Sequence, residues 1–262
     1  MNDRVDISID NHVAEVVLSR PQKMNALDMD MFHALDEAAR SLDSAESVRA
    51  VILHGAGENF CAGIDLNVFQ GGTDIGAAML EPMADSPANI FQRAAYAWRE
   101  LPVPVICALH GVTFGGGFQV AMGADLRYAA PDTQFSIMES KWGLIPDMAI
   151  STTLRAIVPP DRIKELSWTA QVFGADEALR LGVITGIEDD PLGAARRMAG
   201  LIRERSPDAV RGVKCLVNEA WQLSEAQSLA LEAQLQLRLL GAPNQAEAVR
   251  ANLEKRAPEF KD

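Results

Sequence analysis

Two glycine-containing turns, each of which follows an apolar run, constrain this chain most. The first turn, residues 60–66, follows the apolar run 51–53. The second, residues 110–119, contains three consecutive glycines and follows the apolar run 105–109. Glycine lets the backbone approach a ligand closely, and the helix that each turn is expected to open begins with unpaired N–H groups. Two such turns facing one another can hold one carbonyl oxygen between two backbone donors, which is an oxyanion hole.

Composition indicates one sizeable globular domain and excludes several classes of partner. The chain has 262 residues, of which 48% are hydrophobic and 23% charged. The start of the chain is too polar for a signal peptide, and no apolar run approaches the roughly 20 residues that span a bilayer. Three widely separated cysteines indicate reduced cytosolic thiols. The formal net charge of −12 argues against nucleic acid and anionic membrane as partners. We therefore expect a cytoplasmic protein.

Strand-like and helix-like patterns alternate along the first two thirds of the chain and predict an α/β fold. Asn11 and His12 join two strand-like runs as a hairpin. Apolar residues recur at helical spacing over 29–42, with Asp28 placed as the N-cap. Residues 70–90 resemble a mobile loop between two helices.

The apolar residues of that loop, Met79, Leu80 and Met83, either line an acyl pocket or fold back onto the core. Beyond Pro191 the pattern predicts helices over 192–205, 208–240 and 244–256. Asp125 is expected to be structural, paired with Arg127 or with a backbone turn.

Several motifs, taken in order, resemble the crotonase (enoyl-CoA hydratase/isomerase) superfamily. They are the two glycine turns together with residues 18–27, 134–139, 143–147 and 254–260. The resemblance implies a crotonase-like spiral of ββα units with a C-terminal helical region. It divides the chain into an α/β core, 1–195, and a helical region, 196–262, which would close the active site and assemble a homotrimer or a dimer of trimers.

The resemblance assigns the oxyanion hole to the backbone N–H groups of Ile64 and Gly116. They would hold the thioester carbonyl of an acyl-CoA substrate. Otherwise both turns are only tight strand-to-helix connections. Because coenzyme A is anionic, an acidic protein needs a local basic site for it, and Lys23 is the leading candidate unless it is an ordinary solvated charge. The residues expected at coenzyme A are Lys23, Ala26, Ala62, Asp65, Leu66, Lys255 and Phe260.

Glu139 matches the glutamate that serves as acid and base in much of the superfamily, although most glutamates are surface carboxylates. Gln119 stands where hydratases carry a second glutamate. An amide can orient water but cannot exchange protons at neutral pH. Asp147 follows Glu139 at the separation that a Glu and an Asp have in dienoyl-CoA isomerases. Asp147 is either a second catalytic carboxylate or the N-cap of a helix.

The resemblance therefore favours isomerisation of enoyl- or dienoyl-CoA double bonds. Hydration of a 2-enoyl-CoA and non-catalytic binding of acyl-CoA remain alternatives. We expect no cofactor other than the coenzyme A of the substrate. We also expect no metal, since the four histidines lack metal-ligand spacing. Asp65 is expected within the first turn of the helix that opens after residue 63.

Overall fold

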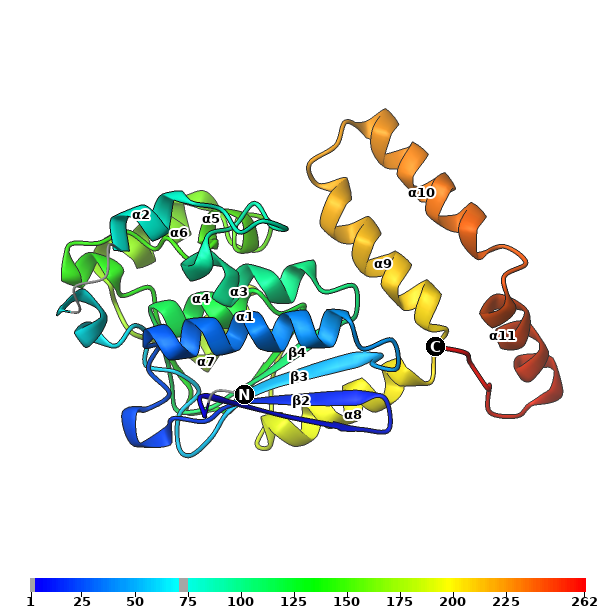
Figure 1. Cartoon of the computed structure of the whole chain (residues 1–262), viewed down its shortest axis with the longest axis horizontal. Coiled ribbons are helices and arrows are strands. Elements are labelled where there is room, and N and C mark those ends of the chain that lie inside the picture. Colours follow the sequence, from blue (N-terminus) through cyan, green and yellow to red (C-terminus); the bar gives the residue numbers. More distant parts are fainter. Residues whose placement is uncertain (1–2, 71–74) are drawn as a thin grey trace.

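A twisted, mainly parallel sheet forms the centre of the molecule (Figure 1). The computed structural model describes residues 3–70 and 75–262. Within them the sheet has the order β1 (Val5–Asp10), β2 (Val13–Leu18), β3 (Ala50–Gly55), β4 (Val105–Leu109), β6 (Leu126–Ala129), β9 (Gly186–Ile187). The β1–β2 pair is antiparallel and the other pairs are parallel. The predicted α/β class is confirmed.

Local signals at the start of the chain have the predicted structural effect. Asn11 and His12 have φ values of 51° and 67°, so both residues of the β1–β2 hairpin turn adopt the left-handed conformation that a tight hairpin requires. The carboxylate of Asp28 accepts a hydrogen bond of 2.9 Å from the Met31 N–H and so caps α1 (Met29–Asp43). Helix α1 packs against α3 (Ile90–Glu100), where the Phe32 and Phe91 rings meet edge to face at 5.0 Å.

A smaller sheet carries the second glycine turn and the segment that follows it. It consists of β5 (Val112–Phe114), β7 (Gln134–Ser136) and β8 (Phe173–Gly174). Helix α4 (Gly116–Met122) begins directly after β5, and the 3-10 helix η3 (Glu139–Trp142) follows β7. Three short helices complete this part: α5 (Ile150–Thr153), α6 (Pro160–Thr169) and α7 (Ala175–Arg180).

Helix α8 (Pro191–Arg203) covers one face of the main sheet, whereas α1 and α3 cover the other (Figure 1). Its alanines at 194, 195 and 199 are buried against β3, β4 and β6. The small side chains let the helix approach the sheet closely. Helix α8 therefore crosses the expected boundary at residues 195 and 196, and the part of the chain that packs on the sheet extends to Arg203.

The C-terminal helices extend away from the sheet (Figure 1). They are α9 (Pro207–Ala220), α10 (Glu225–Leu239) and α11 (Pro243–Glu254). The prediction of one helix over 208–240 is wrong, because the chain turns between α9 and α10. Ser224 and Gln227 form a reciprocal capping box that starts α10, and this local signal prevails over continuous apolar spacing.

The segment expected to be a loop at 70–90 contains a helix, α2 (Ile75–Leu80), so the prediction is wrong at those residues. Residues 71–74 lie outside the described part. Met83 packs against the main core, whereas Leu80 is 85% exposed. For Met83 the fold-back interpretation is confirmed. Among the described residues no helix is long and apolar enough to cross a membrane.

Candidate active site

The two glycine turns lie side by side. The Cys61 N–H donates to the Val112 carbonyl at 3.1 Å, and the Phe114 N–H donates to the Cys61 carbonyl at 3.0 Å. A Cβ added at Gly63 would lie 3.4 Å from the Gly116 nitrogen. The first turn therefore faces the start of α4, as the sequence predicts.

The N–H groups of Ile64 and Gly116 are not used in the hydrogen bonds that their neighbours make. Leu27 donates to the Gly63 carbonyl and accepts from the Asp65 N–H, so the intervening Ile64 N–H points away from Leu27. Gly116 is the first residue of α4, and its N–H therefore has no acceptor within the helix. Ile64 and Gly116 both line a cavity of about 200 Å³. Their role as an oxyanion hole remains a prediction.

Glycine at 116 is a steric requirement of this arrangement. A Cβ there would lie 2.9 Å from both Leu27 Cδ1 and Met148 Sδ. A larger residue would displace these side chains and fill the space next to the cavity. Gly63, with φ +97°, adopts a conformation that other residues rarely tolerate.

Glu139 lines the same cavity and is 7% exposed. Its Oε1 accepts a hydrogen bond of 2.6 Å from Gln119 Nε2, whereas its Oε2 is buried and has no hydrogen-bond partner. Burial raises the pKa of the Glu139 carboxyl, and the charge of Asp147 adds to this; the Gln119 hydrogen bond acts in the opposite direction. One carboxylate oxygen is thus held and the other is available.

Gln119 connects the two segments that carry the candidate carboxylates. It is fully buried on α4, and its Oε1 accepts from the Met148 N–H at 2.8 Å. The same amide therefore holds Glu139 on η3 and the backbone beside Asp147. The carbonyl oxygen and one amide hydrogen are both bonded within the protein.

Asp147 is half-buried, and burial raises the pKa of its carboxyl. The next helix, α5, begins at Ile150 with Ala149 at its N-cap and without a side-chain capping bond. The helix-cap interpretation of Asp147 is therefore wrong.

Comparison with known proteins identifies the family of the chain. The sequence model of the enoyl-CoA hydratase/isomerase family matches residues 8–262. The chain belongs to the enoyl-CoA hydratase/isomerase family. Its homologues are named as enoyl-CoA hydratases or as dienoyl-CoA isomerases, so the chain is an enzyme of this family. The comparisons do not decide between hydration and isomerisation.

Similar proteins carry both activities in their names. The chain is 32% identical to a peroxisomal Δ3,5-Δ2,4-dienoyl-CoA isomerase of Arabidopsis thaliana, over 96% of this chain and 93% of the relative. It is also 32% identical to a probable enoyl-CoA hydratase of Mycobacterium tuberculosis, over 96% and 95%. The solved structure of an enoyl-CoA hydratase from Bacillus anthracis superposes with a TM-score of 0.90 at 26% identity, covering 98% of this chain and 99% of that one.

Five of the residues expected at coenzyme A lie in or beside the first turn: Lys23, Ala26, Ala62, Asp65 and Leu66. The Ala62 N–H donates to the Met24 carbonyl at 2.9 Å, next to the exposed Lys23. The Ala26 carbonyl accepts from Arg20 at 3.0 Å. Leu66 lines the cavity.

Asp65 also belongs to this group. It immediately precedes the 3-10 helix η2 (Leu66–Gln70), so the expectation that it lies within a helix is wrong. Its carboxylate accepts from the Asn67 N–H at 3.1 Å and pairs with Arg20 at 2.8 Å. These two bonds lower the pKa of the Asp65 carboxyl. Because Arg20 is neutralised here, Lys23 is the more available cation.

Lys255 and Phe260 do not join this group within one chain. The Phe260 carbonyl accepts from Arg49 at 3.1 Å, immediately before β3, whereas the first turn follows the opposite end of that strand. Lys255 is the C-cap of α11, and Figure 1 shows α11 apart from the main sheet, beyond α9. Their role at coenzyme A therefore remains a prediction.

Sequence reasoning missed three apolar residues that line the cavity, Met138, Trp142 and Leu144. All three lie within five residues of Glu139 in the sequence, and this proximity is the signal that could have identified them. Asp125 is structural, as expected, but its partners are Lys214 and the Val105 N–H, both at 2.7 Å, and not Arg127. Within the described residues no cluster of His, Cys, Asp and Glu is suited to a metal ion.

Proposed function

We propose that this member of the enoyl-CoA hydratase/isomerase family shifts a double bond of an enoyl- or dienoyl-CoA. The observation that carries the proposal is the hydrogen bond between Gln119 and Glu139. Gln119 occupies the place of the second glutamate that hydratases of this superfamily carry. An amide does not exchange protons at neutral pH, so the paired carboxylates that activate water are not both present. Glu139 and Asp147 are the remaining acid–base groups.

In the proposed reaction the thioester oxygen accepts hydrogen bonds from the Ile64 and Gly116 N–H groups. These bonds stabilise the negative charge that develops on oxygen when a proton leaves the acyl chain. The Glu139 carboxylate takes that proton through Oε2, the oxygen that has no protein partner. The resulting enolate is protonated at another carbon, which moves the double bond without net gain or loss of atoms.

The environment of the two carboxylates suits this role. Burial raises the pKa of both, which brings a carboxylate closer to the range in which it accepts and returns a proton readily. Asp147 would serve carbons farther along a dienoyl chain than Glu139 reaches. Gln119 holds both segments and so fixes the distance between the two groups.

Hydration of a 2-enoyl-CoA is the second candidate, supported by the names of the M. tuberculosis and B. anthracis relatives. Non-catalytic binding of acyl-CoA is disfavoured by Glu139, because burying a carboxylate with an unpartnered oxygen is costly without a use for it.

We further propose acyl-CoA as the substrate, with Lys23 near the coenzyme A phosphates and no additional cofactor. A homotrimer or dimer of trimers is supported by α10, which has no buried residue in the single chain and exposes Leu229, Leu237 and, just beyond it, Leu240. Such assembly offers a neighbour's Lys255 and Phe260 a route to the site. We also propose residence in the cytoplasm, which only the sequence pattern supports, since some relatives are peroxisomal or mitochondrial.

The test is to incubate the enzyme with crotonyl-CoA, a 3-enoyl-CoA and a 3,5-dienoyl-CoA and to follow the ultraviolet spectrum of each. We expect rapid spectral change with the two isomerase substrates and slow loss of the crotonyl-CoA double bond. Fast hydration of crotonyl-CoA with little isomerisation would establish the second candidate. No turnover of any of the three would favour a binding protein.

A further inference from the structure

The Ile64 N–H lies at the end of a series of hydrogen bonds inside the chain. The Gly63 carbonyl and the Ile64 N–H belong to one peptide unit, and a trans peptide directs these two groups in opposite directions. The Gly63 carbonyl accepts from the Leu27 N–H at 2.8 Å. The orientation of the Ile64 N–H is therefore set by the position of the Leu27 N–H.

The Leu27 N–H in turn belongs to a peptide unit that a side chain holds. The carbonyl of this unit is that of Ala26, which accepts from Arg20 Nη1 at 3.0 Å. The bonds thus run head to tail from the Arg20 guanidinium through two peptide units to the Ile64 N–H. Hydrogen bonds in series polarise one another, so a cation at one end strengthens the donor at the other.

The same guanidinium nitrogen also holds the residue that follows Ile64. Arg20 Nη1 lies 2.8 Å from Asp65 Oδ2, and the Asp65 N–H donates to the Leu27 carbonyl at 2.9 Å. One nitrogen therefore joins the segment of Leu27 to the first turn on the far side of Ile64. The Arg20 and Asp65 side chains are 12% and 11% exposed, so water competes little for this contact.

Arg20 is itself held at both its backbone and its guanidinium. Its N–H donates to Asn25 Oδ1 at 2.9 Å, and the Asn25 N–H donates to the Arg20 carbonyl at 2.9 Å. Asn25 is fully buried, and its Nδ2 donates to the carbonyls of residues 56, 59 and 60, which lead into the first turn. Arg20 Nη2 lies 3.3 Å from Asp28 Oδ2. The guanidinium therefore has a fixed base from which to hold the backbone.

We propose that Arg20 is a positioning residue of the oxyanion hole, which orients and polarises the Ile64 N–H through the two peptide units between them. The inference rests on the proposed function, because the acceptor at the end of the series is the thioester oxygen of an acyl-CoA. In this role Arg20 acts through the backbone and does not contact the substrate. Its loss should lower turnover, whereas the loss of a phosphate-binding cation should raise the Michaelis constant.

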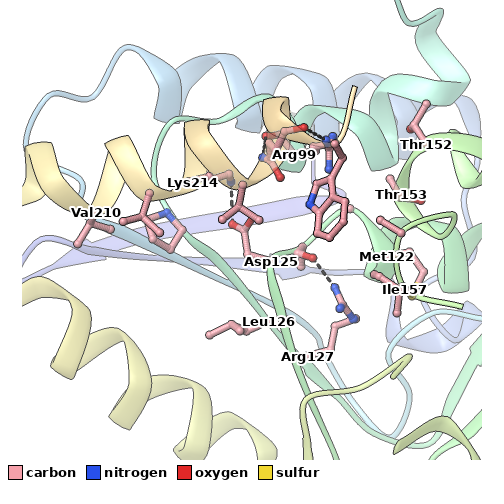
Figure 2. Close-up of a pocket in the computed structure, with 18 of the residues that line it drawn as sticks. Arg99, Met122, Asp125, Leu126, Arg127, Thr152, Thr153, Ile157, Val210 and Lys214 are labelled. Atoms are coloured by element: carbon pink, nitrogen blue, oxygen red, sulfur yellow. Dashed lines mark hydrogen bonds and ion pairs between the residues drawn. The ribbon is translucent and has the colours of Figure 1, made fainter. Parts of the chain in front are cut away.

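A buried cation can also serve the fold alone, and Lys214 is an example. It reaches from α9 to the Asp125 carboxylate at 2.7 Å (Figure 2) and donates to the carbonyls of Trp98 and Val103, both at 2.9 Å. Lys214 lines a different cavity, of about 670 Å³, beside α9. If Arg20 were only structural, its variants would resemble Lys214 variants, which should be less stable but keep the oxyanion hole intact.

The probe is 2,4-hexadienoyl-CoA, whose thioester carbonyl stretches at a lower frequency when hydrogen bonds polarise it. Raman difference spectroscopy gives this frequency for the bound probe. Turnover and the Michaelis constant are measured with the acyl-CoA that the wild type converts fastest. Arg20→Met removes the guanidinium, and Arg4→Met is the matched control, because Arg4 pairs with the same Asp28 but has its other ion pairs with Asp3 and Asp30. Lys214→Met controls for the loss of a structural cation.

We expect Arg20→Met to lower turnover roughly 10- to 100-fold and to change the Michaelis constant less than about threefold. The carbonyl frequency of the bound probe should rise toward its value in water. Arg20→Lys keeps the charge on a shorter side chain and should show smaller changes in the same direction, so it decides the question if Arg20→Met does not fold. Arg4→Met and Lys214→Met should leave the carbonyl frequency as in the wild type.

Wild-type turnover and carbonyl frequency in a folded Arg20 variant would overturn the proposal. A rise in the Michaelis constant alone would also overturn it, because Arg20 would then be a coenzyme A contact. So would an equal frequency shift in Lys214→Met, since the loss of any buried cation would then disturb the hole. An unshifted carbonyl in the wild type would contradict the oxyanion hole itself, and the role of Arg20 with it. Fast hydration without isomerisation would overturn only the isomerase assignment, because the hole serves either reaction.

Discussion

Replacing Gln119 by glutamate should convert a single proton carrier into a pair that shares a proton. Gln119 Nε2 lies 2.6 Å from Glu139 Oε1, and glutamate has nearly the same shape as glutamine. The new carboxylate can still accept from the Met148 N–H, so the local structure should be retained. The variant therefore changes proton chemistry more than geometry.

The magnitude follows from that separation. Two negative charges 2.6 Å apart repel by about 6 kcal/mol at an effective dielectric constant of 20. Each pKa unit corresponds to about 1.4 kcal/mol, so the pair should keep one proton at neutral pH. One group can then act as acid while the other acts as base, which is what addition of water requires.

The assay compares hydration of crotonyl-CoA with isomerisation of a 3,5-dienoyl-CoA across pH. We expect Gln119→Glu to raise the hydratase-to-isomerase ratio roughly tenfold or more and to move the acidic limb of isomerisation, which reports ionisation of Glu139, to higher pH. Gln119→Met is the control, because it removes both hydrogen bonds and adds no titratable group; it should lower both activities without raising the ratio. An unchanged ratio and pH profile in a folded Gln119→Glu variant would refute the reasoning.

Three further predictions follow from the other residues. Glu139→Gln should lower isomerase turnover by roughly 10²–10⁴-fold with little change in the Michaelis constant. Because burial raises the pKa of Glu139 in the folded state, ionisation of Glu139 costs stability at pH values above its unfolded pKa. Glu139→Gln should therefore raise the melting temperature at neutral pH. This increase should disappear as the pH falls below the ordinary pKa range of glutamate. An increase in melting temperature that persists at low pH would show that it does not arise from ionisation of Glu139. Asp147→Asn should impair turnover most on dienoyl substrates, and equal loss on 3-enoyl-CoA would argue against a role farther along the chain. Lys23→Glu should raise the Michaelis constant for coenzyme A thioesters, and added salt should weaken their binding to the wild type. The control Arg238→Glu makes an equal charge change on α10 and should leave the Michaelis constant unchanged. An equal increase in both variants would show that Lys23 is not part of the binding site.

Features governed by local rules were predictable from the sequence. The Asp28 cap and the Asn11–His12 turn depend on a few adjacent residues. The facing glycine turns follow from neighbouring parallel strands, β3 and β4, which deliver their carboxyl ends to the same edge. Fold class and the proximity of the two turns were therefore accessible before the structure, whereas the assignment of the two donors to Ile64 and Gly116 came from the family resemblance and remains a prediction.

Features decided by tertiary contacts were not predictable. The break between α9 and α10 is different, because the capping box of Ser224 and Gln227 that marks it is local and was overlooked within an otherwise helical pattern. The alternative of a helix cap for Asp147 failed because α5 begins only at Ile150, with Ala149 at its N-cap and without a side-chain bond. The separation of Lys255 from the first turn depends on the direction in which the C-terminal helices leave the core, and no local pattern encodes that direction.

The most direct test of the account is a structure with a slowly reacting dienoyl-CoA analogue bound. The account predicts the thioester oxygen at about 2.7–3.1 Å from the Ile64 and Gly116 nitrogens. It also predicts Glu139 Oε2 facing the acyl chain and Asp147 facing it from farther along. A thioester oxygen away from both N–H groups, or a water held between Gln119 and Glu139 with Asp147 turned away from the chain, would contradict it.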